Sequence, residues 1–400
     1  MRPLAYIVGR SFLPAMSGLS MRTRLTFDYF TRTSQVGARY LLAPCGQPEL
    51  EPAVAPHWQR DEIGTGPAGR GQAQKPTKVE ALRQMRDMMA CRWSASARTR
   101  ILGYFSGLDF GASSAIQARL ASWPDAVVFL TRSDLLPLVR HKAPGQKWIL
   151  DANDSVANLV RAYDGRRRLR KSVGMDNAKL CRILEEAELR AAGRCDAIIA
   201  ISPADEQYFK RSACPVISME EQCVEYTAGP VQPKAPKYDI GFIGSDHEGS
   251  RKAALSLVEV AQNPRTSRFS FAIAGRVTQR LHGISPSPNL SLVGEVPSSQ
   301  AFLADCRATV FISSGETGTS VKFQEAILSG TTVIANANAA RWSLAKPGRD
   351  YLEIADSDAL VPLLEKGLPC LPLAPALSAH ATREALQDRL DAVIARCCSR

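Results

Sequence analysis

Apolar and polar residues alternate along the chain in blocks that predict a series of strands and helices. Short apolar runs rich in β-branched residues recur, and each is followed by apolar residues at helical spacing. Most runs are continuously apolar, as expected of parallel strands that helices cover on both faces. The predicted strands are residues 4–8, 38–43, 100–105, 126–131, 148–152, 197–201, 216–218, 239–244, 269–275, 290–293, 309–313 and 332–335. This succession predicts an α/β fold.

The strands and helices divide into two doubly wound domains. The proline-rich stretch 230–236 is typical of a linker between them. We therefore predict an N-terminal Rossmann-like domain over residues 1–233 and a C-terminal one over residues 234–400, and we assign a final packing helix, residues 383–396, to the C-terminal domain. Residues 51–78, rich in glycine, proline and charge, are predicted to form a long surface loop.

Composition and charge narrow the class of protein. With 400 residues, 45% hydrophobic and 22% charged, the chain is long enough for two cores and is neither disordered nor collagen-like. No apolar run reaches the roughly 20 residues of a membrane-spanning helix. The net charge of +11 lies wholly in residues 1–237, which hold 34 basic and 23 acidic residues, whereas the remainder holds 16 of each. We therefore expect the two domains to have different partners.

The cysteines and the N-terminus indicate the compartment. The ten cysteines are scattered, without the C-x-x-C spacing of zinc or redox sites, and are interpreted as free thiols in a reducing cytoplasm. The apolar stretch 4–8 is too short for a signal peptide, and Arg10 interrupts it. We expect a cytoplasmic protein.

Residues 309–336 carry the most chemical information. They predict a strand, a glycine-rich turn, a helix and a second strand. Gly315 and Gly318 permit a tight turn, and Thr319 and Ser320 then start the helix, where free backbone amides bind phosphate well.

Two charged residues follow this turn on one face of the predicted helix. Lys322 and Glu325 are three residues apart, so their side chains are neighbours. A carboxylate there can accept hydrogen bonds from ribose hydroxyls while the turn holds phosphates. The alternative is an ordinary strand–helix–strand unit with a capped helix and Glu325 on a solvated face.

This segment resembles the donor-binding motif of the GT-B glycosyltransferases, in particular the retaining family 4, or group 1, enzymes. In that family a Glu-Gly-x-Gly turn precedes a helix with a glutamate, then Ala, Gly and a Val/Ile-rich strand. Glu325, Ala326 and residues 330–335 match the second half. In the first half, Glu316 stands one place away from the family's first glutamate, which falls on Thr317.

Other family members have Gly-x-x-x-Lys-x-x-Glu without the first glutamate, and these match more closely through Gly318, Lys322 and Glu325. The resemblance implies that the turn, with Glu316, and the helix start bind a nucleotide-sugar donor.

The resemblance covers most of residues 238–340. A strand ends in the turn Gly244-Ser245, which the resemblance places at the donor, and Arg251 and Lys252 begin the next helix. In the family a basic residue in this region neutralises the diphosphate as it leaves, so both are catalytic candidates. Alternatively, they are plain surface charges.

The first domain resembles the family more weakly. Residues 6–18, ending at Gly18, are similar to the family's first strand and glycine loop. Residues 148–155 place Asp151 and Asp154 where a strand ends, and the resemblance implies that such a segment lines the acceptor side. Asp154 is the candidate for an acceptor contact or a base. Alternatively, Asp154 or Ser155 merely caps the next helix.

A basic cluster distinguishes the first domain. Its members are Arg161, Arg166, Arg167, Arg168, Arg170 and Lys171. Our hypothesis is that the cluster docks on an anionic membrane surface or a lipid-phosphate acceptor, which would make the protein peripheral at the inner face of the membrane. The alternative is a solvated face paired with Glu185, Glu186 and Glu188. No aromatic interleaving supports nucleic-acid binding.

The sequence lacks the motifs of several other enzyme classes. The one Gly-x-Gly-x-x-Gly, residues 64–69, follows no predicted strand, and no P-loop or Gly-x-Ser-x-Gly elbow occurs. Asp356 and Asp358 favour a helix cap over a metal site.

We predict a two-domain GT-B glycosyltransferase without cofactor or metal. It would use a nucleotide-diphosphate sugar and a glycan or lipid-linked acceptor, with retention of configuration, in polysaccharide biosynthesis. The alternatives are a nucleotide-sugar epimerase on the same fold and a degenerate GT-B binding protein.

Overall fold

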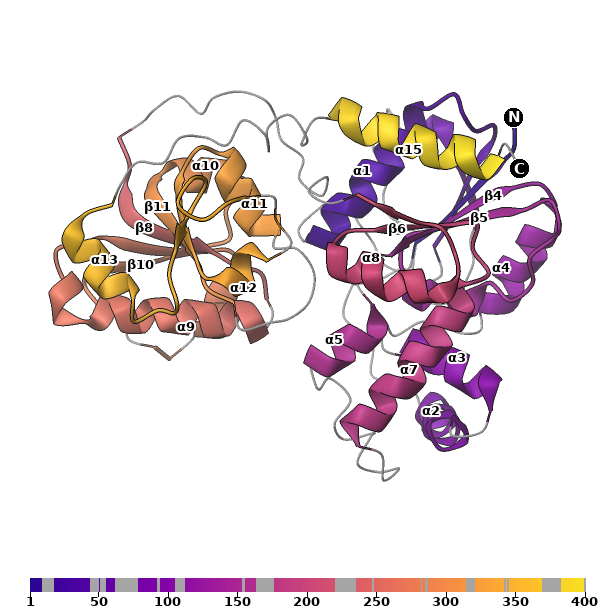
Figure 1. Ribbon diagram of the computed structural model, residues 1–400, viewed down its shortest axis with the longest axis horizontal. Helices are drawn as coiled ribbons and strands as arrows, with labels where there is room; N and C mark the ends of the chain where they lie inside the picture. Colours follow the sequence, from indigo (N-terminus) through magenta and orange to yellow (C-terminus); the bar gives the residue numbers. More distant parts are fainter. Residues whose placement is uncertain are drawn as a thin grey trace. The chain divides into compact units, whose positions relative to one another are not determined.

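The computed structural model consists of two compact units, each built on one sheet (Figure 1). Unit 1 comprises Met1–Glu220 and Gln387–Arg400, and unit 2 comprises Glu221–Leu386. The residues that the structure describes are 1–8, 18–43, 50, 55–61, 78–91, 94–104, 112–152, 155–162, 176–219, 235–246, 248–281, 283–284, 287–313, 321–341, 343, 345–368 and 383–398. The predicted linker and the boundary between residues 233 and 234 lie outside them.

The sheet of unit 1 has seven strands in the order β3-β2-β1-β4-β5-β6-β7, and every neighbouring pair is parallel. The strands are β1 (Leu4–Ile7), β2 (Arg39–Leu42), β3 (Gln59–Asp61), β4 (Val127–Leu130), β5 (Lys147–Ala152), β6 (Ala197–Ala200) and β7 (Val216–Ser218). The helices are α1 (Gly18–Arg32), α2 (Lys78–Ala90), α3 (Ala95–Tyr104), α4 (Ala112–Ala121), α5 (Val156–Ala162), α7 (Asn177–Ala192), α8 (Pro203–Phe209) and α15 (Arg383–Cys398), with short 3-10 turns η1 (Ala55–His57), η2 (Ser133–Leu138) and η3 (Lys210–Ser212).

The sheet of unit 2 has six parallel strands in the order β10-β9-β8-β11-β12-β13. The strands are β8 (Tyr238–Ile243), β9 (Phe271–Ala274), β10 (Leu290–Gly294), β11 (Cys306–Phe311), β12 (Thr332–Ala335) and β13 (Leu352–Glu353). The helices are α9 (Glu248–Gln262), α10 (Ser299–Ala304), α11 (Val321–Leu328), α12 (Ala337–Ala340) and α13 (Leu360–Lys366), with 3-10 turns η4 (Pro264–Thr266) and η5 (Arg276–Leu281). The predicted α/β class with two parallel, doubly wound sheets is confirmed.

Each sheet is covered on both faces, which explains its continuously apolar strands. In unit 2 one core contains residues of α9 and α13, and a second core, on different strand residues, contains residues of α10, α11 and α12. In unit 1 the helices α3, α4, α5, α7 and α8 share one core with the sheet. A cluster of aromatic rings around Tyr6 includes Phe27, Phe30 and Phe129 and joins α1 to β1 and β4.

From Gln387 onward the C-terminal helix α15 belongs to unit 1, whereas the sequence prediction assigned it to the C-terminal domain. Its predicted apolar stripe, Leu386, Leu390, Val393 and Ile394, is buried. The Tyr29 hydroxyl of α1 donates a hydrogen bond to Asp391 of α15, and the two helices lie side by side in Figure 1. Helical spacing predicted that α15 packs on a domain. The choice of domain depends on contacts between residues far apart in the sequence, such as Tyr29 and Asp391, which are 362 positions apart.

The prediction of a strand at residues 100–105 is wrong, because this segment ends helix α3. Ala97, Ile101 and Leu102 are fully buried at spacings of four and five, which suits one face of a helix. The Ser94 hydroxyl accepts a hydrogen bond from the Ala97 amide and starts the helix. Within the predicted loop 51–78, the structure also places η1 and the short edge strand β3, whose polar sequence gave no strand signal.

Candidate functional site

The carboxyl ends of the strands in unit 2 lie at one edge of its sheet, because all the strands are parallel. Gly244 and Ser245 follow β8, Gly275 follows β9, and Ser313 lies two residues after β11. β8 and β11 are neighbours at the point where the winding of the sheet reverses. Ligands of doubly wound sheets bind outside the carboxyl ends of the strands at this switch point. We therefore take this edge as the candidate site.

Two glycines bring the backbone at this edge into close contact. The Gly275 amide donates to the Gly294 carbonyl at 2.7 Å, and the Gly244 amide donates to the Ala274 carbonyl at 3.1 Å. Gly275 has a φ of +89°, and a Cβ atom there would overlap the Gly244 carbonyl oxygen. The turn after β9 therefore requires glycine at position 275, where the backbone packs directly against the turn after β8.

We expect Gly275→Ala to lower the free energy of unfolding of unit 2 by about 2–4 kcal/mol, because it adds a backbone overlap to the strain of a positive φ. Gly283→Ala is the matched control, since Gly283 has a φ of +85° but nothing within 4 Å of its added methyl group. The control should lose only about 1 kcal/mol. Hydrogen exchange of the β8 and β9 amides measures the difference, and equal losses in the two variants would contradict the prediction.

The end of β11 is held by Asn336, which follows β12. The Ser313 amide donates to Asn336 Oδ1 at 3.1 Å, and Asn336 Nδ2 donates to the Ser313 carbonyl at 2.9 Å. Asn336 Oδ1 also accepts from the Ala339 amide and so caps α12. The point where the predicted phosphate-binding turn leaves the sheet is therefore anchored. The turn itself, with Gly315, Glu316, Gly318, Thr319 and Ser320, lies outside the described residues.

Helix α11 brings Lys322 and Glu325 together, as their spacing predicted. Lys322 Nζ donates to Glu325 Oε2 at 2.7 Å. The Glu325 side chain is 4% exposed, whereas that of Lys322 is 28% exposed. Glu325 is therefore a buried carboxylate in the first turns of the helix, which contradicts the alternative of a solvated face.

The sequence analysis missed Gln324, which lies beside this pair. Its residue exposure is 3%, and neither side-chain polar atom has a hydrogen-bond partner among the described residues. A buried amide without partners costs about 1–3 kcal/mol. The helix sequence, VKFQEAIL, gave no signal for Gln324, because Lys322 and Glu325 beside it are polar as well.

The basic candidates Arg251 and Lys252 lie in the first turn of α9, after Gly244. Arg251 contacts Glu248 at 3.4 Å and is 40% exposed, and Lys252 is exposed. Arg280 of η5, which the sequence analysis missed, forms an ion pair with Asp246 and lies 3.8 Å from Glu248. The sequence signal that could have indicated Arg280 was its position shortly after a strand, because η5 directly follows β9.

In unit 1, Asp151 ends β5 in a buried ion pair. Both of its carboxylate oxygens accept hydrogen bonds from Arg22 of α1, at 2.5–3.0 Å, and the two side chains are 0% and 3% exposed. Burial raises the pKa of Asp151, although Arg22 lowers it. The pair ties α1, which begins at Gly18, to the sheet. Asp154 lies outside the described residues, and its role stays a prediction, as does an acceptor contact by Asp151.

A second buried carboxylate, Glu188 of α7, organises the same region and was weighed in the sequence only as a surface partner. It accepts hydrogen bonds from the hydroxyls of Ser133, Ser155 and Tyr208 at 2.5, 3.0 and 2.8 Å and from the Val156 amide at 2.9 Å. Burial raises the pKa of Glu188, although these hydrogen bonds lower it. Glu188 therefore holds the start of α5 next to the end of β5. This role depends on the contact between Glu188 and Val156, which are 32 positions apart in the sequence.

Of the basic cluster, the structure describes only Arg161. Its guanidinium lies 3.6 Å from Glu185 and the side chain is 51% exposed. Arg211 also pairs with Glu185. Arg166, Arg167, Arg168, Arg170 and Lys171 lie outside the described residues. Pairing with Glu185 is thus observed for Arg161.

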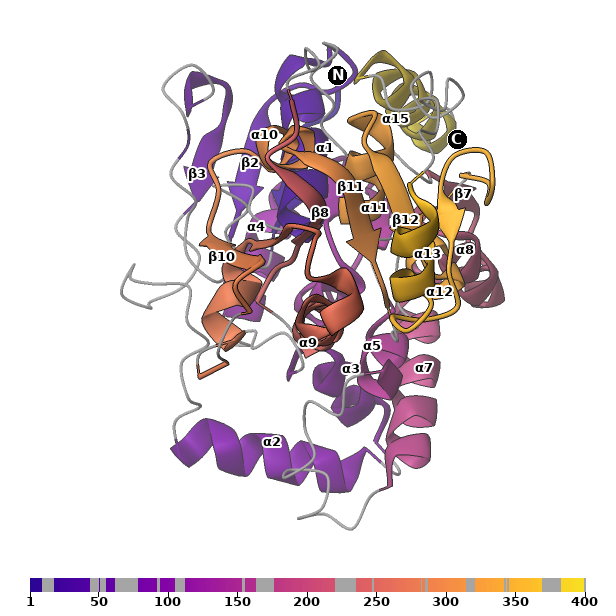
Figure 2. The ribbon, with the colours of Figure 1, turned by 90° about the vertical axis from the view of Figure 1, so that its left-hand side faces the viewer.

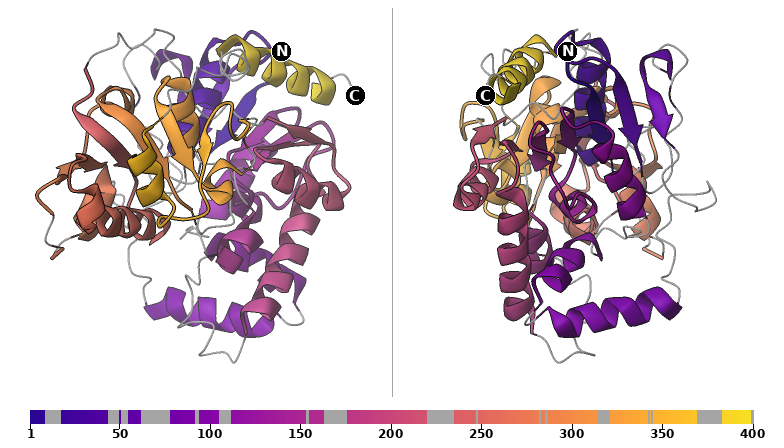
Figure 3. Two further views of the ribbon diagram at one scale, coloured as in Figure 1. Left: turned by 60° about the vertical axis from the view of Figure 1, so that its left-hand side comes forward. Right: turned by 90° about the vertical axis from the view of Figure 1, so that its right-hand side faces the viewer.

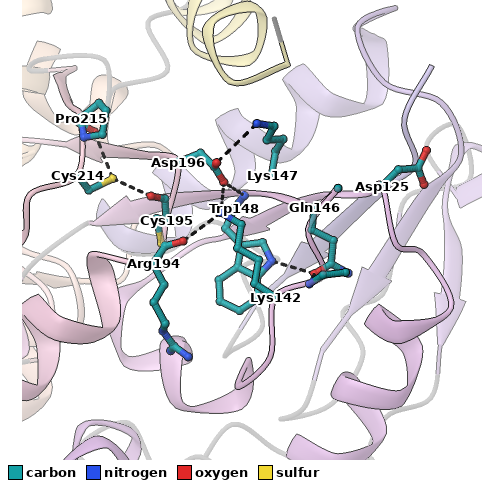
Figure 4. A network of polar contacts seen from close by, with 12 residues as sticks. Asp125, Lys142, Gln146, Lys147, Trp148, Arg194, Cys195, Asp196, Cys214 and Pro215 are labelled. Atoms are coloured by element: carbon teal, nitrogen blue, oxygen red, sulfur yellow. Dashed lines mark hydrogen bonds and ion pairs between the residues drawn. The ribbon is translucent and has the colours of Figure 1, made fainter. Parts of the chain in front are cut away.

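The opposite, amino edge of the first sheet contains a separate pocket of about 220 Å³. Figure 4 shows the polar contacts among residues at this edge, including Lys147, Asp196 and Cys214. The lining of the pocket includes Lys147, Asp196 and three buried cysteines, Cys195, Cys214 and Cys397. Asp196 Oδ2 accepts from Lys142 Nζ at 2.5 Å and from the Trp148 amide at 2.7 Å, and the Cys214 thiol donates to the Cys195 carbonyl. The network joins the starts of β5 and β6, so we assign it a structural role.

We expect these three thiols to resist alkylation in the folded protein. Burial raises the pKa of Cys214 to about 12 and that of Cys397 to about 11, and it also raises the pKa of Cys195. The thiolate fraction at pH 7.5 is then roughly 10³-fold below that of an ordinary cysteine. Peptide mapping after iodoacetamide treatment, with a guanidinium-unfolded control, measures the rates. Native rates equal to unfolded ones would refute the prediction.

Within the described ranges, no helix combines the length and the apolarity needed to cross a membrane. In the same residues, no three His, Cys, Asp or Glu side chains gather so that they could hold a metal ion.

Comparison with protein families identifies the second unit. Residues 237–366 match the family model described as glycosyl transferases group 1. The match spans the β8–α9 turn and the Lys322–Glu325 pair. It confirms the resemblance to group 1 glycosyltransferases and the predicted enzyme class, a glycosyltransferase. No curated protein is significantly similar to the sequence.

Solved structures share the fold of most or nearly all of the chain. Sucrose-phosphate synthase from Thermosynechococcus elongatus has a TM-score of 0.65 and 12% identity over 98% of both chains. HepE from Anabaena, in complex with UDP and glucose, has a TM-score of 0.63 and 8% identity over 99% of this chain and 100% of HepE. TarM from S. aureus, in complex with fondaparinux, alpha-GlcNAc-glycerol and UDP, has a TM-score of 0.54 and 12% identity over 72% of this chain and 59% of TarM. These similarities confirm the predicted GT-B fold class.

Proposed function

We propose that this chain, whose residues 237–366 match the group 1 glycosyltransferases, transfers a sugar from a nucleoside-diphosphate sugar to a hydroxyl of a glycan or lipid-linked acceptor, with retention of configuration. The observation that carries the proposal is the Glu325 carboxylate, buried and paired with Lys322 at 2.7 Å, in the first turns of the helix that follows the switch-point strand β11. HepE has been solved with UDP and with UDP-glucose, so a UDP-linked sugar is the first donor to test.

In this proposal, Glu325 orients the nucleoside. Lys322 contacts Oε2, so we expect Oε1 to accept a hydrogen bond from a ribose hydroxyl. A charged acceptor forms roughly twice as strong a hydrogen bond as a neutral one, and the buried ion pair keeps the carboxylate in one position. The contacts of Ser313 with Asn336 fix the position at which the chain leaves β11.

The leaving diphosphate is stabilised by nearby cations. Arg251, Lys252 and Arg280 all follow strands that end at the candidate edge, and their guanidinium and ammonium groups neutralise the charge that develops on the departing phosphate. The bond between the sugar C1 and the phosphate oxygen breaks, and the acceptor oxygen forms a bond to C1 on the same face. The acceptor proton passes to the departing phosphate oxygen, which accounts for retention without a separate base.

The acceptor belongs to unit 1 in this proposal. The ion pair Arg22–Asp151 and the Glu188 network hold the ends of β5 and the start of α5, between which Asp154 lies in the sequence. We assign Asp154 to the acceptor hydroxyl. A lipid-linked acceptor in polysaccharide biosynthesis would place the enzyme at the inner membrane face, with the cluster Arg161–Lys171 on its phosphates.

Calorimetric titration of the full chain with UDP-, ADP- and GDP-sugars, followed by a turnover assay with lipid-linked and glycan acceptors, tests the proposal. We expect one donor to bind and to release its nucleotide only when an acceptor is present, with EDTA leaving turnover unchanged. Conversion of the sugar without an acceptor would establish an epimerase instead. Binding without turnover on any acceptor would indicate a degenerate binding protein, and no binding at all would overturn the donor site.

A further inference from the structure

Helix α2 presents apolar side chains to solvent. Leu82, Met85 and Met89 are 64%, 37% and 50% exposed. They are three and four residues apart, so they form one stripe along the helix. Among the described residues, no other helix has large hydrophobic side chains that are this exposed.

The opposite face of α2 is the one that packs on the protein. Asp87 is 1% exposed and accepts two hydrogen bonds from Arg100 of α3, at 2.7 and 2.8 Å, and Cys91, directly after the helix, is fully buried. At 3.6 residues per turn, Asp87 projects 140–160° away from Leu82, Met85 and Met89. An ion pair therefore anchors the inner face, and the apolar stripe faces outward. This arrangement is the reverse of an ordinary surface helix.

The exposed side of α2 is also basic. Arg83 and Arg86 lie along one side of the stripe, both are exposed, and neither has an acidic partner among the described residues. By sequence α2 holds three basic and two acidic residues, and Arg100 neutralises one of the acids, Asp87. This charge agrees with the excess of positive residues in the first part of the chain.

The helix lies at an end of unit 1. In Figures 1, 2 and 3 it is the outermost helix of the unit at the side away from α15, and α3 lies next to it. An apolar stripe bordered by arginines on an outermost helix is the pattern of helices that lie in the plane of a membrane interface.

We propose that α2 docks unit 1 on an anionic lipid bilayer, with Leu82, Met85 and Met89 at the boundary between headgroups and acyl chains and with Arg83 and Arg86 on lipid phosphates. A second copy of the chain fits this surface less well, because a dimer through the stripe would bring the arginines of both copies together, where like charges repel. The inference rests on the proposed function in one respect: it takes the acceptor to be located at the membrane.

Flotation of the full chain with vesicles tests the inference without any assay of turnover. We expect binding to vesicles of phosphatidylcholine with 30% phosphatidylglycerol, weaker binding in 0.5 M salt, and little binding to pure phosphatidylcholine. The combined variant Leu82→Ser, Met85→Ser and Met89→Ser should lose at least tenfold in affinity, because it removes the apolar surface of all three side chains from the acyl boundary. Arg83→Gln with Arg86→Gln should lose about tenfold at low salt.

Two residues of unit 2 supply the matched control. Leu292 and Val293 of β10 are each 38% exposed, so the pair Leu292→Ser and Val293→Ser removes exposed apolar surface elsewhere and should leave vesicle binding unchanged. Circular dichroism checks that each variant is folded.

Three results would overturn the inference: no dependence on anionic lipid, equal loss in the α2 and β10 variants, or a change of oligomeric state in the α2 variant without a change in vesicle binding. The last result would identify the stripe as a protein interface. A protein that does not bind any nucleotide sugar would still bind vesicles. Failure of the proposed function can therefore be distinguished from failure of the membrane inference.

Discussion

Replacing Glu325 by alanine is expected to reduce kcat/KM for the nucleotide sugar about 100-fold. The variant removes a buried carboxylate that is 4% exposed and leaves Lys322 without its partner. The charge-assisted hydrogen bond from a ribose hydroxyl to Oε1 accounts for this factor, since such a bond contributes about 1.5–3 kcal/mol. Calorimetric titration gives the affinity for the donor, and nucleotide release gives the initial rates.

Two further variants make this experiment specific. Glu325→Gln keeps an oxygen acceptor and the shape of the side chain but loses the charge, so it should recover to within about tenfold of the wild type. Glu259→Ala removes an exposed glutamate from α9 of the same unit and should leave donor binding unchanged. Wild-type donor affinity in Glu325→Ala would refute the assignment of the donor site.

Replacing Asp151 by alanine should cause the largest loss of stability, about 3–5 kcal/mol, because it leaves the guanidinium of Arg22 buried without a counter-charge. Burial raises the pKa of Asp151 despite the attraction of Arg22. The desolvation of the carboxylate therefore outweighs its attraction to Arg22, and the expected loss of stability comes from the uncompensated charge of Arg22. Urea unfolding followed by tryptophan fluorescence, to which Trp58, Trp123 and Trp148 of unit 1 contribute, gives the free energy.

The double variant Arg22→Ala with Asp151→Ala should be less destabilised than the sum of the single variants, since no charge remains buried alone. Lys210→Ala provides the control, because it breaks the exposed ion pair with Glu206 in the same unit and should cost less than about 0.5 kcal/mol. If the single and double variants lose stability additively, the two side chains do not act as a pair.

The predictions from the sequence succeeded where a local pattern was sufficient. Continuous apolar runs predicted the strands of both parallel sheets except the short edge strands β3 and β13, because a strand covered on both faces has no polar side. The spacing of Lys322 and Glu325 predicted their shared helix face, because residues three apart on a helix are neighbours. The helix α3 was mistaken for a strand, since its short apolar run has the same composition as a buried strand.

The parts of the site that were missed depend on distant contacts. Gln324 and Arg280 are ordinary polar residues in the sequence, and only the packing around α11 and the position of η5 after β9 single them out. Glu188 was weighed as a surface charge, because nothing near it in the sequence indicates that Ser133, Ser155 and Tyr208 surround it.

By itself, therefore, the sequence determined most strands of the two doubly wound sheets, the glycosyltransferase resemblance and the shared helix face of Lys322 and Glu325. All of these are properties of residues within one or two turns of each other. The tertiary structure decided which segments meet: Arg22 with Asp151 across 129 residues, α15 with unit 1, and Asp87 with Arg100, which turns the apolar stripe of α2 outward. Such contacts depend on how the whole chain buries its surfaces, and no local spacing contains that information.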